Sequence, residues 1–151
     1  METQKGTTAY IERCLPILAG GQTLPLPVLG SSMTPFLGDR RDSVLLRAPE
    51  SPPKVGDILL YRRDSGAFIL HRVHSIQDGT YTMVGDAQTV LEPGIRADQV
   101  CGVVISAQRK GRTQKPGCFW WFFFSRIWIR MVPLRPKILG IYRRMRGKHH
   151  D

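Results

Sequence analysis

Between residues 20 and 107, glycine, proline and aspartate divide the chain into short apolar segments, and this spacing restricts its fold more than any other feature. No helical periodicity separates these segments, and Asp78-Gly79 is typical of a tight hairpin turn. Short strands joined by turns predict a mainly β fold with a coiled antiparallel sheet. The predicted strands span residues 24–29, 43–47, 57–62, 67–76, 80–84 and 100–107.

A short helix is predicted before the first strand, over residues 7–19. Thr7 or Thr8 would cap its start and Gly20 would end it. Glu12 and Arg13 interrupt the apolar run in this segment, so neither a targeting segment nor a membrane-spanning helix is expected here.

The net charge of +10 is distributed unevenly along the chain. Residues 1–108 carry 10 Lys and Arg against 11 Asp and Glu, whereas residues 109–151 carry 12 against one. This change predicts a nearly neutral domain over 1–108 with its core in 22–107, a linker over 109–118, and a basic aromatic tail with a helical end over 119–151.

Cysteine and histidine do not predict a metal site. Cys14, Cys101 and Cys118 are odd in number and far apart, so neither a disulfide framework nor a thiolate zinc site is expected. His71 and His74 would point to opposite faces of one strand. No metal or organic cofactor is therefore expected, and three reduced thiols suit a cytosol-facing protein.

Ser32, His71 and a later acid are the residue types of nucleophilic catalysis. Ser32 follows a predicted strand between Gly30 and Pro35, where a tight bend can hold it exposed. A serine hydroxyl needs a base to take its proton, and the ordinary pKa of histidine suits that task. A carboxylate on the other ring nitrogen fixes the histidine tautomer. Sequence order alone does not bring these groups together.

Three short boxes follow one another along the chain: residues 32–35 (Ser-Met-Thr-Pro), residues 56–58 (Gly-Asp-Ile) followed by His71-Arg72, and residues 85–86 (Gly-Asp). Together and in this order they resemble the boxes of the type I signal peptidases and the related self-cleaving repressor peptidases. The resemblance covers roughly residues 22–105 and implies their coiled β-fold. Because His71 stands where many members have lysine, the chain resembles the Ser–His branch, which includes the endoplasmic-reticulum, archaeal and sporulation-type enzymes.

The resemblance implies that Ser32 is the nucleophile and His71 the general base. Asp86 is the first candidate for the acid that orients His71, and Glu92 is the alternative, because the third box continues here as Ala-Gln where the family usually has asparagine.

The residues around the nucleophile depart from the family in one position. Several family members have a serine where this chain has Gly30, so the oxyanion hole would depend on backbone N–H groups, including that of Ser32, with Ser31 as a helper. Met33 is expected to line the substrate cleft or the core. Arg72 is expected to pair with a carboxylate in a structural role.

These features predict a serine endopeptidase that cleaves a signal or leader segment from a polypeptide. The alternative is a catalytically inactive module of the same fold that docks on a membrane or a partner protein.

The tail admits three predictions. A transmembrane helix over 117–134 would bury Arg126 and Arg130, which is unfavourable. Attachment to an anionic membrane surface fits the tryptophans and cations better, which predicts a peripheral membrane protein, with a cytoplasmic one as the alternative. The aromatic residues could instead pack on a flank of the β-domain. Nucleic acid is not expected as a partner, because no helix–turn–helix, zinc knuckle or RNA-recognition pattern occurs.

Overall fold

In the computed structural model, which describes residues 2–147, the chain begins with helix α1 (Glu2–Ala19). The helix starts earlier than predicted because Glu2, Gln4 and Lys5 all favour helix. It ends where predicted: the N–H of Gly20 donates to the carbonyl of Pro16. One face of α1 is buried against the sheet through Ile11, Cys14 and Leu18.

The rest of the described chain up to residue 114 is an antiparallel sheet, which confirms the predicted mainly β fold. Its strand order is β1-β2-β7-β3-β4-β5-β6, and β8 pairs with β7. The strands are β1 (Leu24–Pro27), β2 (Ser43–Arg47), β3 (Ile58–Arg62), β4 (Phe68–Gln77), β5 (Thr80–Val84), β6 (Glu92–Ile95), β7 (Val100–Arg109) and β8 (Arg112–Gln114), with a short 3₁₀ turn η1 (Ala97–Gln99) before β7.

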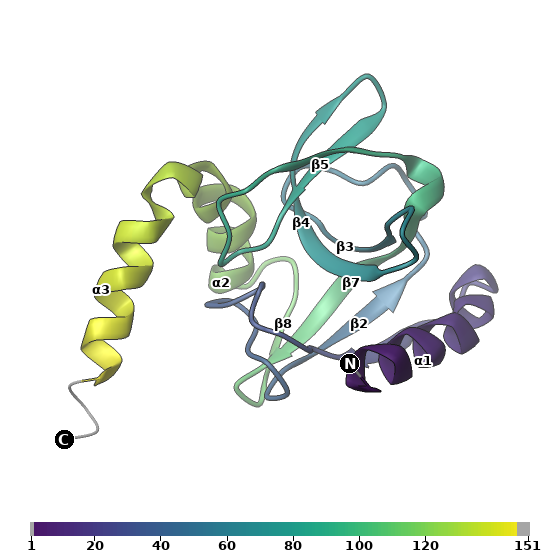
Figure 1. Cartoon of the computed structure of the whole chain (residues 1–151), viewed down its shortest axis with the longest axis horizontal. Coiled ribbons are helices and arrows are strands. Elements are labelled where there is room, and N and C mark those ends of the chain that lie inside the picture. The colour runs from purple at the N-terminus through teal and green to yellow at the C-terminus, as the bar shows by residue number, and fades with distance from the viewer. Residues whose placement is uncertain (1, 148–151) are drawn as a thin grey trace.

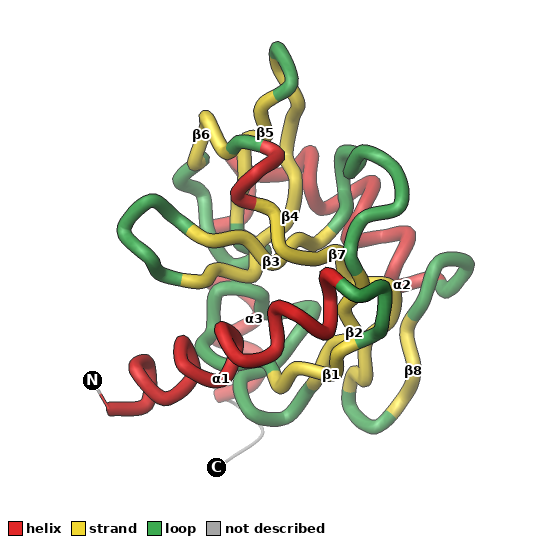
Figure 2. Tube along the Cα trace, turned by 90° about the vertical axis from the view of Figure 1, so that its right-hand side faces the viewer, coloured by secondary structure: helices red, strands yellow, loops and turns green. Residues whose placement is uncertain are grey.

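Irregularities in the strand pairing make the sheet coil. The register shifts between Leu45 and Leu46, between Leu60 and Tyr61, and again in β4 and β5. Such bulges bend a strand and increase its twist. Figure 2 shows β1, β2 and β8 in one half of the molecule and β3 to β6 in the other. The two halves enclose separate apolar clusters, a larger one beneath α1 and a smaller one around β3, β4 and β5.

The predicted linker over 109–118 begins instead as a hairpin. Ala107 pairs with Gln114 and Arg109 with Arg112. Lys110 and Gly111 form the turn with φ values of 53° and 78°, and two such residues in succession match the twist of a hairpin. Strand β8 was not predicted because its three residues carry no apolar alternation.

The tail continues from this hairpin as a series of short helical segments. They are α2 (Phe119–Phe122), a π-helical turn η2 (Phe123–Ile127), a 3₁₀ segment η3 (Trp128–Leu134) and α3 (Arg135–Gly147) (Figure 1). Residues 148–151 of the predicted tail lie outside the described residues. Phe124, Trp128 and Leu139 belong to the larger apolar cluster. The tail therefore shares its core with the β-domain, as the third prediction proposed for some of its aromatic residues.

Arg135 fixes the tail to the loop after β5. Its side chain is fully buried. Nη1 donates to the carbonyls of Gly85 and Gln88 at 2.9 Å, and Nη2 donates to the carbonyl of Trp128 at 3.0 Å. The charge of Arg135 thus serves the fold and is not available to an outside partner.

Within residues 2–147, no helix has the length and apolar character needed to cross a bilayer.

Replacing Arg135 should destabilise the whole protein, because three carbonyls would lose their donor, two of them in buried contacts. For Arg135→Met we expect the free energy of unfolding to fall by about 2–4 kcal/mol, measured by urea denaturation. Arg130→Met is the matched control, since Arg130 is exposed, and it should stay within roughly 0.5 kcal/mol of wild type. Equal stability of the two variants would show that the tail is not part of the cooperative fold.

Candidate active site

The loop after β1 presents Ser32 on a tightly held turn. Gly30 has a φ of 85°, which a glycine adopts freely, and its N–H donates to Asp39 Oδ1 at 2.8 Å. Both the N–H and the hydroxyl of Thr34 donate to the carbonyl of Ser31. The turn leaves Ser32 half-buried and Ser31 exposed. Local hydrogen bonds therefore fix the conformation of the loop that carries the predicted nucleophile.

The third box holds this turn from the other side. The N–H of Ala87 donates to the carbonyl of Ser32 at 2.9 Å. A Cβ atom on Gly85 would lie only 2.6 Å from the same carbonyl oxygen, closer than real Cβ contacts allow. Glycine is thus required at position 85 by the close approach of the Ser32 loop. The first and third boxes, far apart in sequence, are in direct contact.

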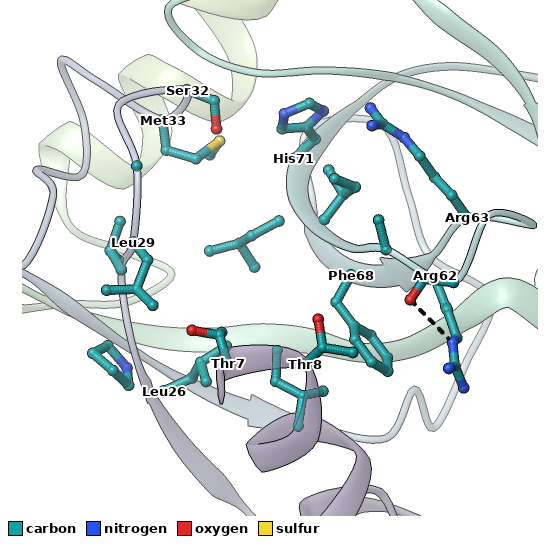
Figure 3. Close-up of a pocket in the computed structure, with 18 of the residues that line it drawn as sticks. Thr7, Thr8, Leu26, Leu29, Ser32, Met33, Arg62, Arg63, Phe68 and His71 are labelled. Carbon is teal, nitrogen blue, oxygen red and sulfur yellow. Dashed lines mark hydrogen bonds between the residues drawn. The ribbon is translucent and has the colours of Figure 1, made fainter. Parts of the chain in front are cut away.

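His71 lies in the middle of β4, where it pairs with Leu59 of β3. Its side chain is only 6% exposed. His71 and Ser32 line one cavity of about 970 Å³. Figure 3 shows the two side chains facing each other at one end of this cavity. The structure therefore brings the predicted nucleophile and the predicted base to the same cavity.

No hydrogen bond joins Ser32 to His71 within the described part of the chain, although both side chains reach the cavity. Catalytic hydrogen bonds are often long in the free protein and tighten when substrate binds. The backbone N–H of Ser32 also donates to no acceptor among residues 2–147. This N–H is therefore available as a donor, and its role in an oxyanion hole stays a prediction.

The other cavity walls are mainly apolar and come from three parts of the chain. Met33 is buried and borders both the cavity and the core, in agreement with its predicted place. Ser31, predicted as a helper, does not line the cavity. Helix α1 forms one wall, which the sequence did not predict. The labelled wall residues in Figure 3 include Thr7, Thr8, Leu26, Leu29 and Phe68.

Asp86 does not make the predicted contact with His71. Its Oδ1 and Oδ2 accept from Nε and Nη2 of Arg72 at 2.8 and 2.9 Å. Nη1 of the same arginine donates to the carbonyl of Gly56 at 2.8 Å. Arg72 and His71 are consecutive in a strand, so they point to opposite faces, and Asp86 lies on the face of Arg72. The predicted structural ion pair of Arg72 is confirmed, and its partner is the first candidate acid.

Glu92, the alternative acid, lies on the side of His71 but does not contact it directly. The hydroxyl of Tyr61 stands between them: it donates to Glu92 Oε1 and lies 3.4 Å from His71 Nδ1. Arg63 holds the carboxylate through Nε to Oε2 at 2.8 Å. Tyr61 and Arg63 were missed by the sequence analysis, because an aromatic or basic residue near a strand end gives no sign of a hydrogen bond to a distant acid.

Burial lowers the pKa of His71 to about 4. The nearby Arg63 guanidinium contributes to this lowering of the pKa, while Glu92 and Asp86 act in the opposite direction. At neutral pH the imidazole is therefore uncharged, which is the state in which a histidine accepts a proton.

The described residues contain no group of three or more His, Cys, Asp or Glu side chains that could hold a metal ion. Comparisons with protein-family models, with curated proteins and with solved structures give no match. Function is therefore inferred from the geometry of this site.

The low pKa of His71 should make stability depend on pH. Unfolded His71 takes up a proton near pH 6.5 and the folded residue only near pH 4. The unfolded state thus binds more protons in this window, and stability falls as the pH drops from 6.5 to 4. We expect His71 to contribute about 3 kcal/mol to this loss.

Urea denaturation of wild type and His71→Asn between pH 4 and pH 7.5 measures this contribution. His74→Asn is the matched control on the same strand, and it should remove a smaller part of the pH dependence because His74 is less buried. Identical pH profiles for wild type and His71→Asn would contradict a lowered pKa.

Proposed function

We propose that this chain is a serine endopeptidase that cleaves a signal or leader segment from a polypeptide, with Ser32 as nucleophile and His71 as general base. The observation that supports this most is that an uncharged, buried histidine and a serine on a fixed turn line the same cavity. The three boxes that resemble the signal peptidases also meet in space, through Gly85 beside Ser32 and through the ion pair of Arg72 with Asp86.

The proposed reaction uses the two side chains in turn. Ser32 Oγ attacks the peptide carbonyl carbon while His71 takes the hydroxyl proton, and the oxyanion accepts a hydrogen bond from the Ser32 N–H. His71 then gives the proton to the leaving amine, so the C–N bond breaks and an ester on Ser32 remains. Water, activated by the same histidine, hydrolyses that ester and restores both groups.

Two unpaired strand edges favour an extended polypeptide as the substrate. Strand β1 is the first strand of the sheet and pairs only with β2. Strand β5 pairs with β4 only from Arg72 onwards, so residues 68–71 of β4 have one free edge. Both edges border the cavity, together with apolar side chains such as Leu26 and Phe68. A peptide can add beside such an edge through its backbone, and the family resemblance implies small residues just before the cut.

A fluorophosphonate probe tests the nucleophile without knowledge of the substrate. Ser32 Oγ would bond to phosphorus, fluoride would leave, and His71 would take the proton. We expect Ser32→Ala to abolish labelling and His71→Ala to slow it by roughly 100-fold or more. Ser75→Ala and His74→Ala are matched controls from β4 and should label at the wild-type rate. Mass spectrometry of the labelled peptide identifies the modified residue.

The inactive binding module gives the opposite result. In that case wild type would not be labelled, leader peptides would not be cleaved, and Ser32→Ala would keep any binding to a partner. Unlabelled wild-type protein with the correct fold would overturn the peptidase proposal.

We also propose that helix α2 attaches the protein to an anionic membrane surface. Phe119, Trp120 and Phe122 remain 66%, 42% and 54% exposed, although neighbouring aromatic residues are buried in the core. Exposed aromatic residues suit the headgroup level, and each nearby cation adds about 1 kcal/mol of attraction to anionic lipid. Exposed cations around this segment are Arg112, Lys115, Arg126 and Arg130.

Vesicle flotation tests this attachment with point variants, because truncating the tail would remove part of the core. Vesicles with 30% phosphatidylserine, about the composition that gives a strong surface potential, should carry wild type upward. The triple variant Phe119→Ser, Trp120→Ser, Phe122→Ser should lose most binding, while the control Val90→Ser, at a residue 80% exposed, should keep it. Equal flotation of both variants would contradict a role for α2.

A further inference from the structure

His71 is connected to a carboxylate only through a tyrosine. Tyr61, on β3, and His71, on β4, are diagonal neighbours on one sheet face, since Leu59 pairs with His71 and Tyr61 pairs with Ile69. The Tyr61 hydroxyl lies 3.4 Å from His71 Nδ1 and donates to Glu92 Oε1. Tyr61 is fully buried. The contact is therefore shielded from water at its centre.

The carboxylate of Glu92, to which Tyr61 donates, is itself held in place. Arg63 donates from Nε to Glu92 Oε2 at 2.8 Å and from Nη2 to Glu92 Oε1 at 3.3 Å. This ion pair and the phenol keep the pKa of Glu92 below its ordinary value, although burial acts against them. Glu92 is thus ionised at neutral pH and accepts hydrogen bonds only.

The direction of the hydrogen bonds follows from the phenol. Burial, together with the neighbouring Glu92, raises the pKa of Tyr61 well above its ordinary value, so the phenol keeps its proton. The phenol O–H donates its hydrogen bond to Glu92 Oε1. The oxygen that faces His71 can then only accept, so Nδ1 must be the nitrogen that carries the proton. Nε2 is left with the free lone pair.

We propose that Tyr61 and Glu92 are positioning residues that set the tautomer and orientation of His71, in the role that a directly bonded carboxylate has in a Ser–His–acid triad. This inference rests on the proposed function for its catalytic meaning. Asp86 does not take this role, because it is paired with Arg72 on the opposite face of β4. The charged groups that act on the pKa of His71 are Arg63 and Glu92, and more weakly Asp86.

The consequence for catalysis concerns the cation formed after proton transfer. When Nε2 takes the Ser32 proton, the imidazolium donates from Nδ1 to the phenol, which donates to the carboxylate. A chain of hydrogen bonds polarises its members in the same direction, so the negative charge of Glu92 acts on the ring without contact. Tyr61 itself gains no net proton.

Nitrogen NMR of the histidine rings tests the tautomer independently of activity. In ¹⁵N-histidine-labelled wild type at pH 7, we expect the His71 shifts of a neutral ring protonated at Nδ1. Tyr61→Phe keeps the ring but removes the acceptor, so the shifts should move toward a mixture of tautomers. Glu92→Gln should move the His71 shifts in the same direction, but by a smaller amount than Tyr61→Phe does. Tyr81→Phe, a change at another buried tyrosine of the same cluster, is the matched control and should leave them unchanged.

The rate of fluorophosphonate labelling gives the second measurement. Tyr61→Phe should lower it by roughly 10- to 100-fold, part of the contribution of a general base, while Tyr81→Phe should not. A wild-type His71 protonated at Nε2, or shifts unaffected in both Tyr61→Phe and Glu92→Gln, would overturn the inference. If the shifts change as expected but wild type is never labelled, the positioning inference stands and the proposed peptidase function fails.

Discussion

The buried ion pair between Arg72 and Asp86 is the interaction on which the rest of the site depends. Both side chains are almost inaccessible to solvent and share two hydrogen bonds. A buried carboxylate without such a partner would be strongly unfavourable. The pair therefore fixes residues 85–87 against β4, and the N–H of Ala87 in turn holds the carbonyl of Ser32. The distance between the Ser32 loop and β4, which carries His71, is set by this contact.

The same short segment also receives the tail. Trp128 Nε1 donates to the carbonyl of Asp86 at 2.8 Å, and Arg135 donates to the carbonyl of Gly85. Because the loop, the strand and the tail all bond to residues 85–88, they support one another's position. The sequence suggests a neutral domain with a separate basic extension, but part of that basic charge is structural and buried. The exposed basic charge that remains lies around α2 and along α3, where Lys137, Arg143, Arg144 and Arg146 are exposed.

The alternation of apolar and polar residues, together with the turn residues, predicts most of the sheet. A half-buried strand needs one apolar face, and Asp78-Gly79 favours a turn through local conformation alone. These patterns do not predict β8, because this short strand forms only by pairing with β7. That Ser32 and His71 act together is a prediction from the resemblance and from their chemistry, and the structure places both at one cavity. For the acid, the sequence favours Asp86 and leaves Glu92 as the alternative. The choice depends on which face of β4 each carboxylate reaches, and only the folded register decides that.

Because His71 is buried, the position of the Glu92 carboxylate decides whether the ring can carry a positive charge. Burial and Arg63 keep the ring neutral, which leaves it ready to accept a proton but opposes the cation that then forms. The cation is favoured only by the acids nearby, and Asp86 is already neutralised by Arg72. Glu92 is shared between Arg63 and Tyr61, so its charge is partly offset as well. A serine and a histidine in one cavity are therefore not sufficient by themselves. The ability of this site to carry a transient positive charge depends on how the phenol of Tyr61 connects the ring to that carboxylate.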